Sequence, residues 1–564
     1  MNPSMNPVGD PLEEQVDQPG PTEAGRPGGE RRQWRRDPVL LAALVATAAP
    51  FVVAVFGLLT KAWDMQAFDD NAVIELTTRE AFTRPQLVGQ VSHLVTRSLG
   101  PMMFWALAPF YWLTGGRSVG LWIGAAFWSC AAALTTVVLA WRRRGRGLAL
   151  LTAALQLVLI ATLGPHQYAD PWNPSLTLLP LATVFMLAWG LAEGADWLAV
   201  PAVVLASYEA QTHLSMVIPT GVMILVALGF RWRLRAGVAP PATGTRAWVR
   251  PIVPLRRNAL IAALVVGVVL WLPPVIDVAL HPPGNLARVA KYTLTSRDHQ
   301  TTLGDGVGAA RFVVGIPPWF ATGGPANDPN GLAVVAGAPV LPLGALLLVG
   351  FGVVAIRRRQ RDLAVPLVVV GALVVAVVLS VWRLVGGFYL YVIGWAAVVS
   401  FLVWLVVLWS TWAECRPLVP RSWRSALPAV ALVALGATTV HASAGSLDPP
   451  DDLAYGQVIA EASGAIRQAL GSTRTVALRF GEQRTNESTS LDQALVLDLV
   501  RQGYEVFTPG EGKWYPERDR SPPSGTPVVW FTGRDSGGNA PAPPDTRRLG
   551  IIGDVALDLG STGP

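Results

Sequence analysis

Long apolar stretches recur along this chain and form its most regular pattern. Several reach the roughly 20 residues that a helix needs to cross a hydrocarbon core of about 30 Å. They cover residues 39–60, 119–140, 259–280, 333–355, 363–382 and 388–412. Further stretches, at 147–164, 175–192, 197–230 and 426–442, fit the same role, and polar residues near Gln211–His213 predict a break within 197–230. The pattern predicts an all-α polytopic membrane protein with about 11–13 transmembrane helices.

The stretch 102–141 allows two interpretations. It holds a short apolar piece (102–114), a Gly-Gly-Arg-Ser break and a long apolar piece (117–141). If both pieces cross, the arginines at 142–146 lie on the outer side, against the rule that basic loops stay inside. If the short piece only dips into the membrane, those arginines lie inside, and we favour this second interpretation.

The two ends of the chain differ from its apolar middle. Residues 1–38 are rich in Pro, Gly and Glu and predict a disordered cytoplasmic tail before the transmembrane domain, 39–442. Residues 443–564 alternate helical patterns with short apolar strands, which predicts a small C-terminal α/β domain. The expected helices are 452–470 and 488–502, and the expected strands are 476–480, 504–507, 527–531 and 549–552. Between the first two spans, the pattern at 71–82 is typical of a helix lying at the membrane interface.

Composition and charge support this picture. Of the 564 residues, 51% are hydrophobic and only 15% are charged, well below the roughly 25% typical of soluble proteins. The net charge of +6 comes from arginine blocks beside the apolar stretches, which is the positive-inside pattern of membrane proteins rather than a nucleic-acid footprint. This charge pattern predicts a multi-pass protein of the plasma membrane. Its N-terminus would lie in the cytoplasm and its C-terminal domain on the outer side. The two cysteines, Cys130 and Cys415, are expected at different depths, so no disulfide is predicted.

Two polar clusters follow spans on the expected outer side. Asp69 and Asp70 are adjacent carboxylates at a membrane surface, where they could act as a general base, hold a divalent cation or cap the helix at 71–82. The segment 170–174 (Asp-Pro-Trp-Asn-Pro) carries two prolines that fix a corner and would hold Asp170 and Asn173 at the membrane face. A simple turn explains the second cluster equally well.

Ionisable residues also lie inside apolar stretches, where their cost makes them functional candidates. Glu209 and His213 are four residues apart, so on a helix they would share a face and either pair with each other or line a polar cavity. Arg383 stands at the outer end of a span, suited to a phosphate or to reaching the interface. Tyr391 follows it, in a position typical of the aromatic belt. The sequence contains no Walker A motif, no Cys and His spacing of a metal site, and no convincing inverted repeat.

Taken in order, these segments resemble the integral-membrane glycosyltransferases of the GT-C fold. The likeness is strongest to the actinobacterial group and more distant to the lipid A aminoarabinose transferases and protein O-mannosyltransferases. It rests on FDDNAVIEL (68–76), on PQLVGQVSHLVTRSLGPMMFWALAPFYWLTGG (85–116), on DPWNP (170–174), on YEAQTHL (208–214), and on Arg383 with Gly387 and Tyr391. The resemblance covers most of 39–442.

The resemblance implies that the protein takes a sugar from a polyprenyl-phosphate donor at the outer leaflet. The acceptor would be a hydroxyl of a cell-envelope glycan or lipid, as in cell wall biogenesis. Asp70 aligns with the acidic residue of the family motif and would be the general base, with Asp69 as the alternate. Asp170 would be a second polar anchor, and Arg383 would hold the donor phosphate. No cofactor is certain, and a divalent cation at Asp69 and Asp70 is left open.

One departure from the family pattern keeps other functions open. Relatives carry a His-Pro-Gly-Pro element where this chain has Ser98-Leu99-Gly100-Pro101, and His93 is the nearest histidine that could substitute. A non-catalytic glycolipid-binding scaffold, or a transporter or flippase of a lipid-linked saccharide, are therefore the competing hypotheses.

Overall fold

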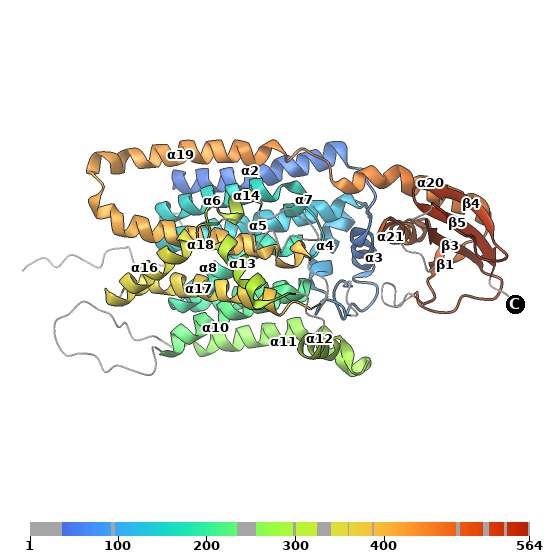
Figure 1. Cartoon of the computed structure of the whole chain (residues 1–564), viewed down its shortest axis with the longest axis horizontal. Coiled ribbons are helices and arrows are strands. Elements are labelled where there is room, and N and C mark those ends of the chain that lie inside the picture. The colour runs from blue at the N-terminus through green and yellow to red at the C-terminus, as the bar shows by residue number, and fades with distance from the viewer. Residues whose placement is uncertain are drawn as a thin grey trace, which may run out of the picture.

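The chain folds into a long helical bundle with a small α/β domain at one end (Figure 1). The computed structural model describes residues 37–91, 96–233, 255–296, 301–323, 340–358, 360–385, 389–480, 486–510, 518–534 and 538–561. Residues 1–36 of the expected disordered tail, His93, Gly387, residues 333–339 of an expected span and most of the basic stretch 231–257 lie outside these residues.

Apolar helices run along the length of the bundle (Figure 1). Seven stretches of the described chain are long and apolar enough to cross a membrane, by length and composition alone. Shorter apolar helices, such as Leu343–Arg357, add to them. The bundle helices are α2 (Pro38–Lys61), α5 (Val119–Arg144), α6 (Arg146–Leu163), α8 (Leu178–Ala192), α9 (Ala199–Thr212), α10 (Val217–Arg233), α11 (Arg257–Leu280), α16 (Leu343–Arg357), α17 (Arg361–Trp382), α18 (Trp395–Cys415) and α19 (Arg421–Ala444). The prediction of a polytopic all-α membrane protein is confirmed.

Shorter helices connect them. These are α3 (Asp70–Glu80), α4 (Met102–Leu113), α7 (Pro165–Tyr168), α12 (Gly284–Thr295), α13 (Leu303–Val313) and α14 (Trp319–Thr322), with 3-10 turns η3 (Ser175–Thr177), η4 (Asp196–Leu198), η5 (Leu214–Met216), η6 (Leu390–Ile393), η7 (Arg416–Leu418) and η8 (Asp451–Tyr455). The polar region 281–332 thus contains α12, α13 and α14 within its described residues. One of them, α13, is started by a capping box between Thr302 and Asp305, a local signal that polarity alone hides.

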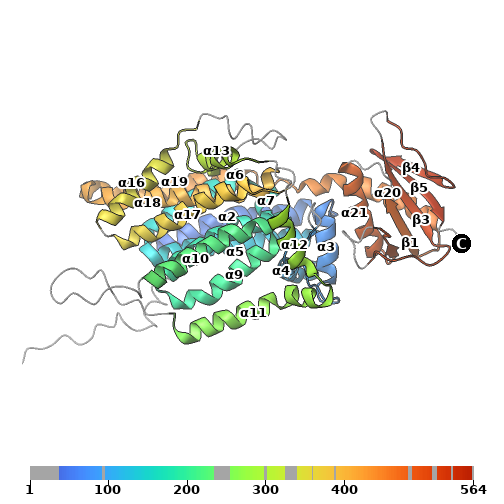
Figure 2. The ribbon, with the colours of Figure 1, turned by 60° about the horizontal axis from the view of Figure 1, so that its bottom comes forward.

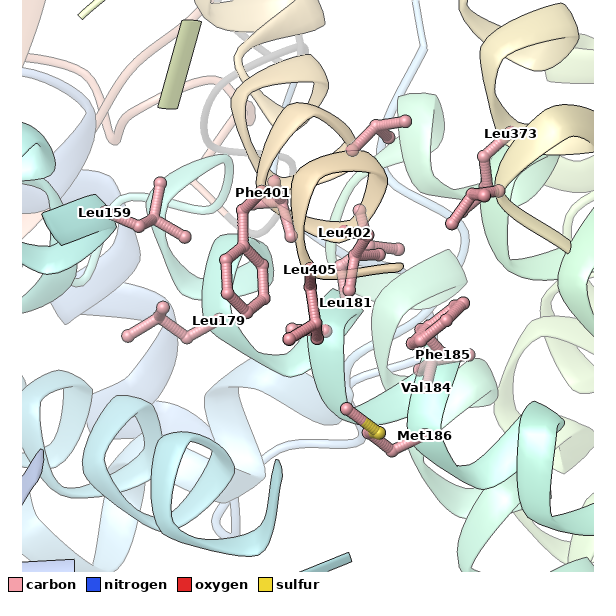
Figure 3. Packing of buried hydrophobic residues seen from close by; sticks show 14 of the residues in the cluster. Leu159, Leu179, Leu181, Val184, Phe185, Met186, Leu373, Phe401, Leu402 and Leu405 are labelled. Carbon is pink, nitrogen blue, oxygen red and sulfur yellow. The ribbon is translucent and has the colours of Figure 1, made fainter. Parts of the chain in front are cut away.

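Helix α8 is the centre of the bundle. All of its residues are buried, as expected for a helix that is apolar on every side. Figure 3 shows its side chains Leu179 and Leu181 close to Phe401 and Leu405 of α18, within one apolar cluster. This packing fixes the helices whose ends carry the polar residues described below.

The bundle has two chemically distinct ends, which we name the Asp37 end and the Asp70 end. At the Asp37 end, the Asp37 side chain accepts hydrogen bonds from the first amides of α2 and pairs with Arg146, which opens α6. Arg143 and Arg144, in the last turn of α5, pair there with Glu193. The Asp70 end carries α3 and faces the C-terminal domain (Figure 2).

The ambiguity at 102–141 is resolved by this arrangement. Helix α4 has 12 residues and so a length of about 18 Å, too short to cross a hydrocarbon core. Its Ala106 carbonyl accepts a hydrogen bond from Trp128 in the first half of α5, so α4 lies beside that half alone. Helix α5 then continues to the Asp37 end. Of the two pieces, the long one alone runs the length of the bundle, and the arginines at 142–146 share an end with Asp37. This agrees with the favoured interpretation, and the side of the membrane on which the arginines lie stays a prediction.

The predicted break near Gln211–His213 is also present. Helix α9 ends at Thr212, His213 has an extended backbone (φ −142°, ψ 130°), and α10 begins at Val217 after the turn η5. Arg256, just before α11, donates its backbone N–H to Asp196, just before α9. The chain has therefore come back, after α10, to the end of the bundle where α9 begins. Residues 197–230 thus form a hairpin of two helices.

The C-terminal domain is a five-stranded mixed sheet with helices on one face. Its sheet order is β2-β1-β3-β5-β4, with β1 parallel to both neighbours and the remaining pairs antiparallel. Its elements are α20 (Gly456–Leu470), β1 (Thr475–Phe480), α21 (Asn486–Arg501), β2 (Glu505–Phe507), β3 (Pro527–Gly533), β4 (Arg547–Ile552) and β5 (Val555–Ser561). The expected helices and strands are found, and β5 is an addition that the sequence did not predict.

This domain packs against α3 rather than hanging freely from the bundle. Both views place α3 between the bundle and α21 (Figures 1 and 2). One apolar cluster contains Ile74 of α3, Leu107 of α4 and Leu495 of α21. The helix at 71–82, expected at the membrane interface, is therefore covered by protein on both sides.

Candidate active site at the Asp70 end

The adjacent carboxylates Asp69 and Asp70 stand where the chain enters α3. Asp69 has a positive φ of 53°, a strained backbone for a residue with a Cβ, and its side chain makes no capping hydrogen bond. Asp70 is the first residue of α3, and its Oδ2 accepts a hydrogen bond of 2.9 Å from Trp172 Nε1. Backbone strain of this kind is often found at functional sites, where surrounding contacts maintain it.

The corner at 170–174 lies directly across from this turn. Asp170 Oδ1 accepts hydrogen bonds from its own loop, at Trp172 N (3.0 Å), and from Asn71 Nδ2 (3.2 Å). Asn173 is buried and its Nδ2 donates to Thr212 O at 3.1 Å, which anchors the corner to the end of α9. The structure thus brings Asp70 and Asp170 together, and it uses Asn173 to hold the corner in place.

A third carboxylate reaches the same place from the other end of the chain. Asp452, in η8, accepts hydrogen bonds from Phe68 N (2.8 Å) and from Asn71 Nδ2 (3.5 Å). The Tyr455 ring stacks on Phe68, with centroids 3.8 Å apart. Sequence reasoning missed Asp452, although the Asp451-Asp452 pair shortly after the last apolar stretch was an available signal.

These carboxyl groups have unusual acidity. Burial raises the pKa of Asp170 to about 7, the nearby Asp451 and Asp70 add to the rise, and its two hydrogen bonds oppose it. Burial likewise raises the pKa of Asp452 to about 7, helped by repulsion from Asp170. The pKa of Asp69 is also raised by desolvation, against a hydrogen bond from Ser490. Groups with such pKa values can exchange protons near neutral pH.

The other predicted site residues lie at varying distances from this cluster. Tyr391 joins it, with its ring centroid 4.7 Å from that of Trp172. Arg383 lies at the end of α17 with an exposed side chain, and within the described residues no hydrogen bond or ion pair joins it to the aspartates.

Glu209 and His213 do not form the pair considered above. Since α9 ends at Thr212, His213 leaves the helix face, and its Nδ1 lies 2.6 Å from Ser215 Oγ. Glu209 is fully buried, and its carboxylate oxygens have no hydrogen-bond partner among the described residues.

The Ser98-Leu99-Gly100-Pro101 segment packs tightly against the same end of α9. A Cβ on Gly100 would lie only 2.1 Å from Gln211 Oε1, so a larger residue there would require the Gln211 side chain to move. Asn285 Nδ2 donates to the Ser98 carbonyl at 3.2 Å and fixes the segment from the side of α12. In this chain the segment is thus held by backbone contacts.

Two cavities lie at this end of the bundle. A small one of about 50 Å³ is lined by acidic residues including Asp170, Asp451 and Asp452. A larger, open one of about 630 Å³ lies between the residues after α3, α4 and α11; its lining includes Phe82, Arg84, Leu87, Trp105, Pro273 and Ile276. Within the described residues, no group of three or more His, Cys, Asp or Glu side chains is placed to hold a metal ion.

The fold is that of the GT-C membrane proteins, as the sequence resemblance predicted. The chain is similar to the crystal structure of ArnT from Cupriavidus metallidurans bound to undecaprenyl phosphate, with a TM-score of 0.53 and 13% identity over 92% of this chain and 97% of that one. The apo structure of ArnT gives the same TM-score and identity, and covers 98% of that chain. The chain matches no protein-family model and no curated protein sequence.

Proposed function

We propose that this protein is a membrane glycosyltransferase that moves a sugar from a polyprenyl-phosphate donor to a hydroxyl of a cell-envelope glycan or lipid. The observation that carries the proposal is Asp70, held by Trp172 beside Asp170 at the end of an ArnT-like bundle. The similar ArnT structure holds undecaprenyl phosphate, a lipid of the same chemical class as the proposed donor.

Asp70 would act as the general base. As the acceptor oxygen attacks the anomeric carbon of the sugar, its proton passes to the Asp70 carboxylate. The bond from that carbon to the phosphate oxygen breaks, and the polyprenyl phosphate leaves with the electron pair. Trp172 orients the Asp70 carboxylate through an N–H group. Because this donor is neutral, it does not cancel the negative charge of Asp70 that attracts the proton. Asp69 is the alternate base, one residue away on the strained turn.

The larger cavity suits the lipid part of the donor. Phe82, Trp105 and Ile276 supply apolar surface for a prenyl chain, and the side chain of Arg84, 47% exposed, lies in the same lining. A guanidinium group there would neutralise the departing phosphate. Arg383 remains a second candidate for this role at the end of α17.

The orientation follows from the arginines. They concentrate at the Asp37 end, so this end would face the cytoplasm and the Asp70 end, with the C-terminal domain, the outside. The reaction would then take place at the outer surface of the plasma membrane.

The test is a transfer assay with purified protein in detergent. The donors would be radiolabelled polyprenyl-phosphate arabinose and polyprenyl-phosphate mannose, offered with a cell-envelope fraction as acceptor. The proposal expects a labelled glycan from the wild type and its loss in Asp70→Ala, with the variant still folded. Full activity in both Asp70→Ala and Asp69→Ala would refute the site, and movement of label across liposomes without a new glycosidic bond would indicate a transporter.

A further inference from the structure

Glu75 is a buried carboxylate in the helix that begins with Asp70. Its side chain is fully buried on α3 and forms an ion pair with Arg501, the last residue of α21 in the C-terminal domain. Asn71 and Glu75 are four residues apart and therefore share one face of α3. That face is contacted at Asn71 by Asp170 of the bundle and at Glu75 by Arg501 of the C-terminal domain.

Arg501 is also linked, through Ser118, to the chain just before Asp70. Its Nη2 donates to Gly116 O at 3.2 Å and to Ser118 Oγ at 3.1 Å. The same Ser118 Oγ accepts a hydrogen bond of 3.1 Å from Ala67 N, just before the strained turn. One guanidinium group thus constrains the backbone on both sides of Asp70, through Ser118 on one side and Glu75 on the other.

The ion pair between Glu75 and Arg501 couples the position of α3 to the C-terminal domain. Burial raises the pKa of Glu75, and the charge of Arg501 opposes this rise. A buried charge left without its partner is strongly unfavourable, so α3 is expected to shift if Arg501 is lost. All three contacts are made by Nη2 of Arg501, so one end of a single side chain joins Glu75, the Gly116 carbonyl and the Ser118 hydroxyl.

We propose that Arg501 is a positioning residue for the transfer reaction: through Glu75 and Ser118 it fixes the rotation of α3 and aims the Asp70 carboxylate at the acceptor. The inference rests on the proposed function and adds to it a residue of the C-terminal domain. This domain would then be part of the catalytic unit rather than a separate module.

The experiment compares Arg501→Met with Arg520→Met in the full-length protein. Arg520 pairs with Glu505 on the exposed side of the same domain, with side chains 61% and 55% exposed, and serves as the matched control. Arg501→Met is expected to lower kcat about 100-fold while the donor KM stays within about twofold, because displacing the base slows the chemical step. Arg501→Lys should recover part of kcat, and Arg520→Met should behave as wild type.

A second variant separates positioning from folding. Glu75→Gln with Arg501→Met removes both charges, so no buried charge is left unpaired and the fold should survive. In this double variant the midpoint of thermal unfolding should return toward the wild-type value, while kcat stays low. Hydrogen exchange of the amides at the start of α3 should be faster than in the wild type in both variants.

The outcomes also distinguish this inference from the proposed function. Wild-type protein that transfers no sugar would refute the proposed function, and hydrogen exchange would still test the positioning of α3 without an assay of activity. A folded Arg501→Met protein with wild-type kcat, or with unchanged exchange at α3, would overturn the inference.

Discussion

The carboxylates of the candidate site at the Asp70 end are held differently from those at the Asp37 end. At the Asp37 end, Arg146 lies 2.9 Å from Asp37, and Arg144 lies 2.6 Å from Glu193. At the Asp70 end, Asp170 and Asp452 accept hydrogen bonds from amide and backbone N–H groups, and no ion pair found between described residues includes them.

This difference indicates which carboxylates can take part in chemistry. An arginine partner favours the charged form and makes a carboxylate a weak base, whereas neutral donors orient it without cancelling its charge. By this criterion Asp37 and Glu193 are structural, and so is Glu80 of α3, which pairs with Arg518 of the C-terminal domain. The presence or absence of an arginine partner thus distinguishes acidic residues that look alike in the sequence.

The all-or-none prediction concerns the sides of the membrane. With Cys415→Ser as background, Arg142→Cys and Glu505→Cys place single exposed thiols at the Asp37 end and in the C-terminal domain. A membrane-impermeant maleimide added to intact cells should label Glu505→Cys and leave Arg142→Cys unlabelled until the cells are opened. Labelling of both thiols in intact cells would show that the ends are not on opposite sides.

A large difference is expected between Asp170→Ala and Glu193→Gln. Asp170→Ala removes the acceptor for Asn71 and Trp172, so the support of Asp70 is lost and kcat should fall about 100-fold. Glu193→Gln breaks a largely buried ion pair far from the site, so kcat should stay within about twofold while the unfolding midpoint falls by about 5 °C. Kinetics and thermal unfolding of the two proteins measure this, and equal losses of activity would erase the contrast between the ends.

A moderate effect is expected at the lipid cavity. Arg84→Gln removes the cation proposed to meet the donor phosphate and should raise the donor KM about tenfold. Arg358→Gln, which breaks a pair with Glu414 at the Asp37 end, is the control and should leave KM unchanged. If Arg383→Gln raises KM and Arg84→Gln does not, the phosphate lies at the end of α17 instead.

The smallest effect is a pH dependence of stability. Because the pKa values of Asp170 and Asp452 are raised to about 7 in the folded protein, their protonated forms favour folding. Their contribution is present at low pH and is lost as the pH rises through about 7, so the unfolding midpoint should fall by about 3 °C between about pH 6 and pH 8. Asp452→Asn, which keeps a neutral side chain, should flatten this dependence, and an unchanged slope would contradict it.

Much of the fold could be predicted because lipid imposes simple requirements. Span length, the break before His213 and the helices and strands of the C-terminal domain all follow from local periodicity. Strand β5 was missed because its apolar run, Val555–Leu557, is short, and the polar or small residues Asp558, Gly560 and Ser561 make up most of the rest. The depth of α4 was uncertain in sequence and became clear only through the partners of Asp37 and Glu193.

The candidate site was accessible from the sequence only where local motifs mark it. Asp70 and Asp170 each follow a span within a short polar motif, and the structure brings them together, while their roles stay predictions. Asp452 and Arg501 were not identified, because their contacts depend on the C-terminal domain folding back onto α3. Arg84 became a candidate only in the structure, since an arginine beside an apolar groove is recognisable only when the groove has formed.

The pairing of Glu75 with Arg501 has a consequence for how the protein is made. During translation α3 leaves the ribosome long before α21, so its carboxylate waits without a partner while the remaining bundle helices are inserted. On the proposed function, the catalytic site at the Asp70 end would be completed only when the last part of the chain folds. Unfinished chains would then reach the membrane without consuming the lipid-linked sugar pool, which ties the onset of activity to the end of synthesis.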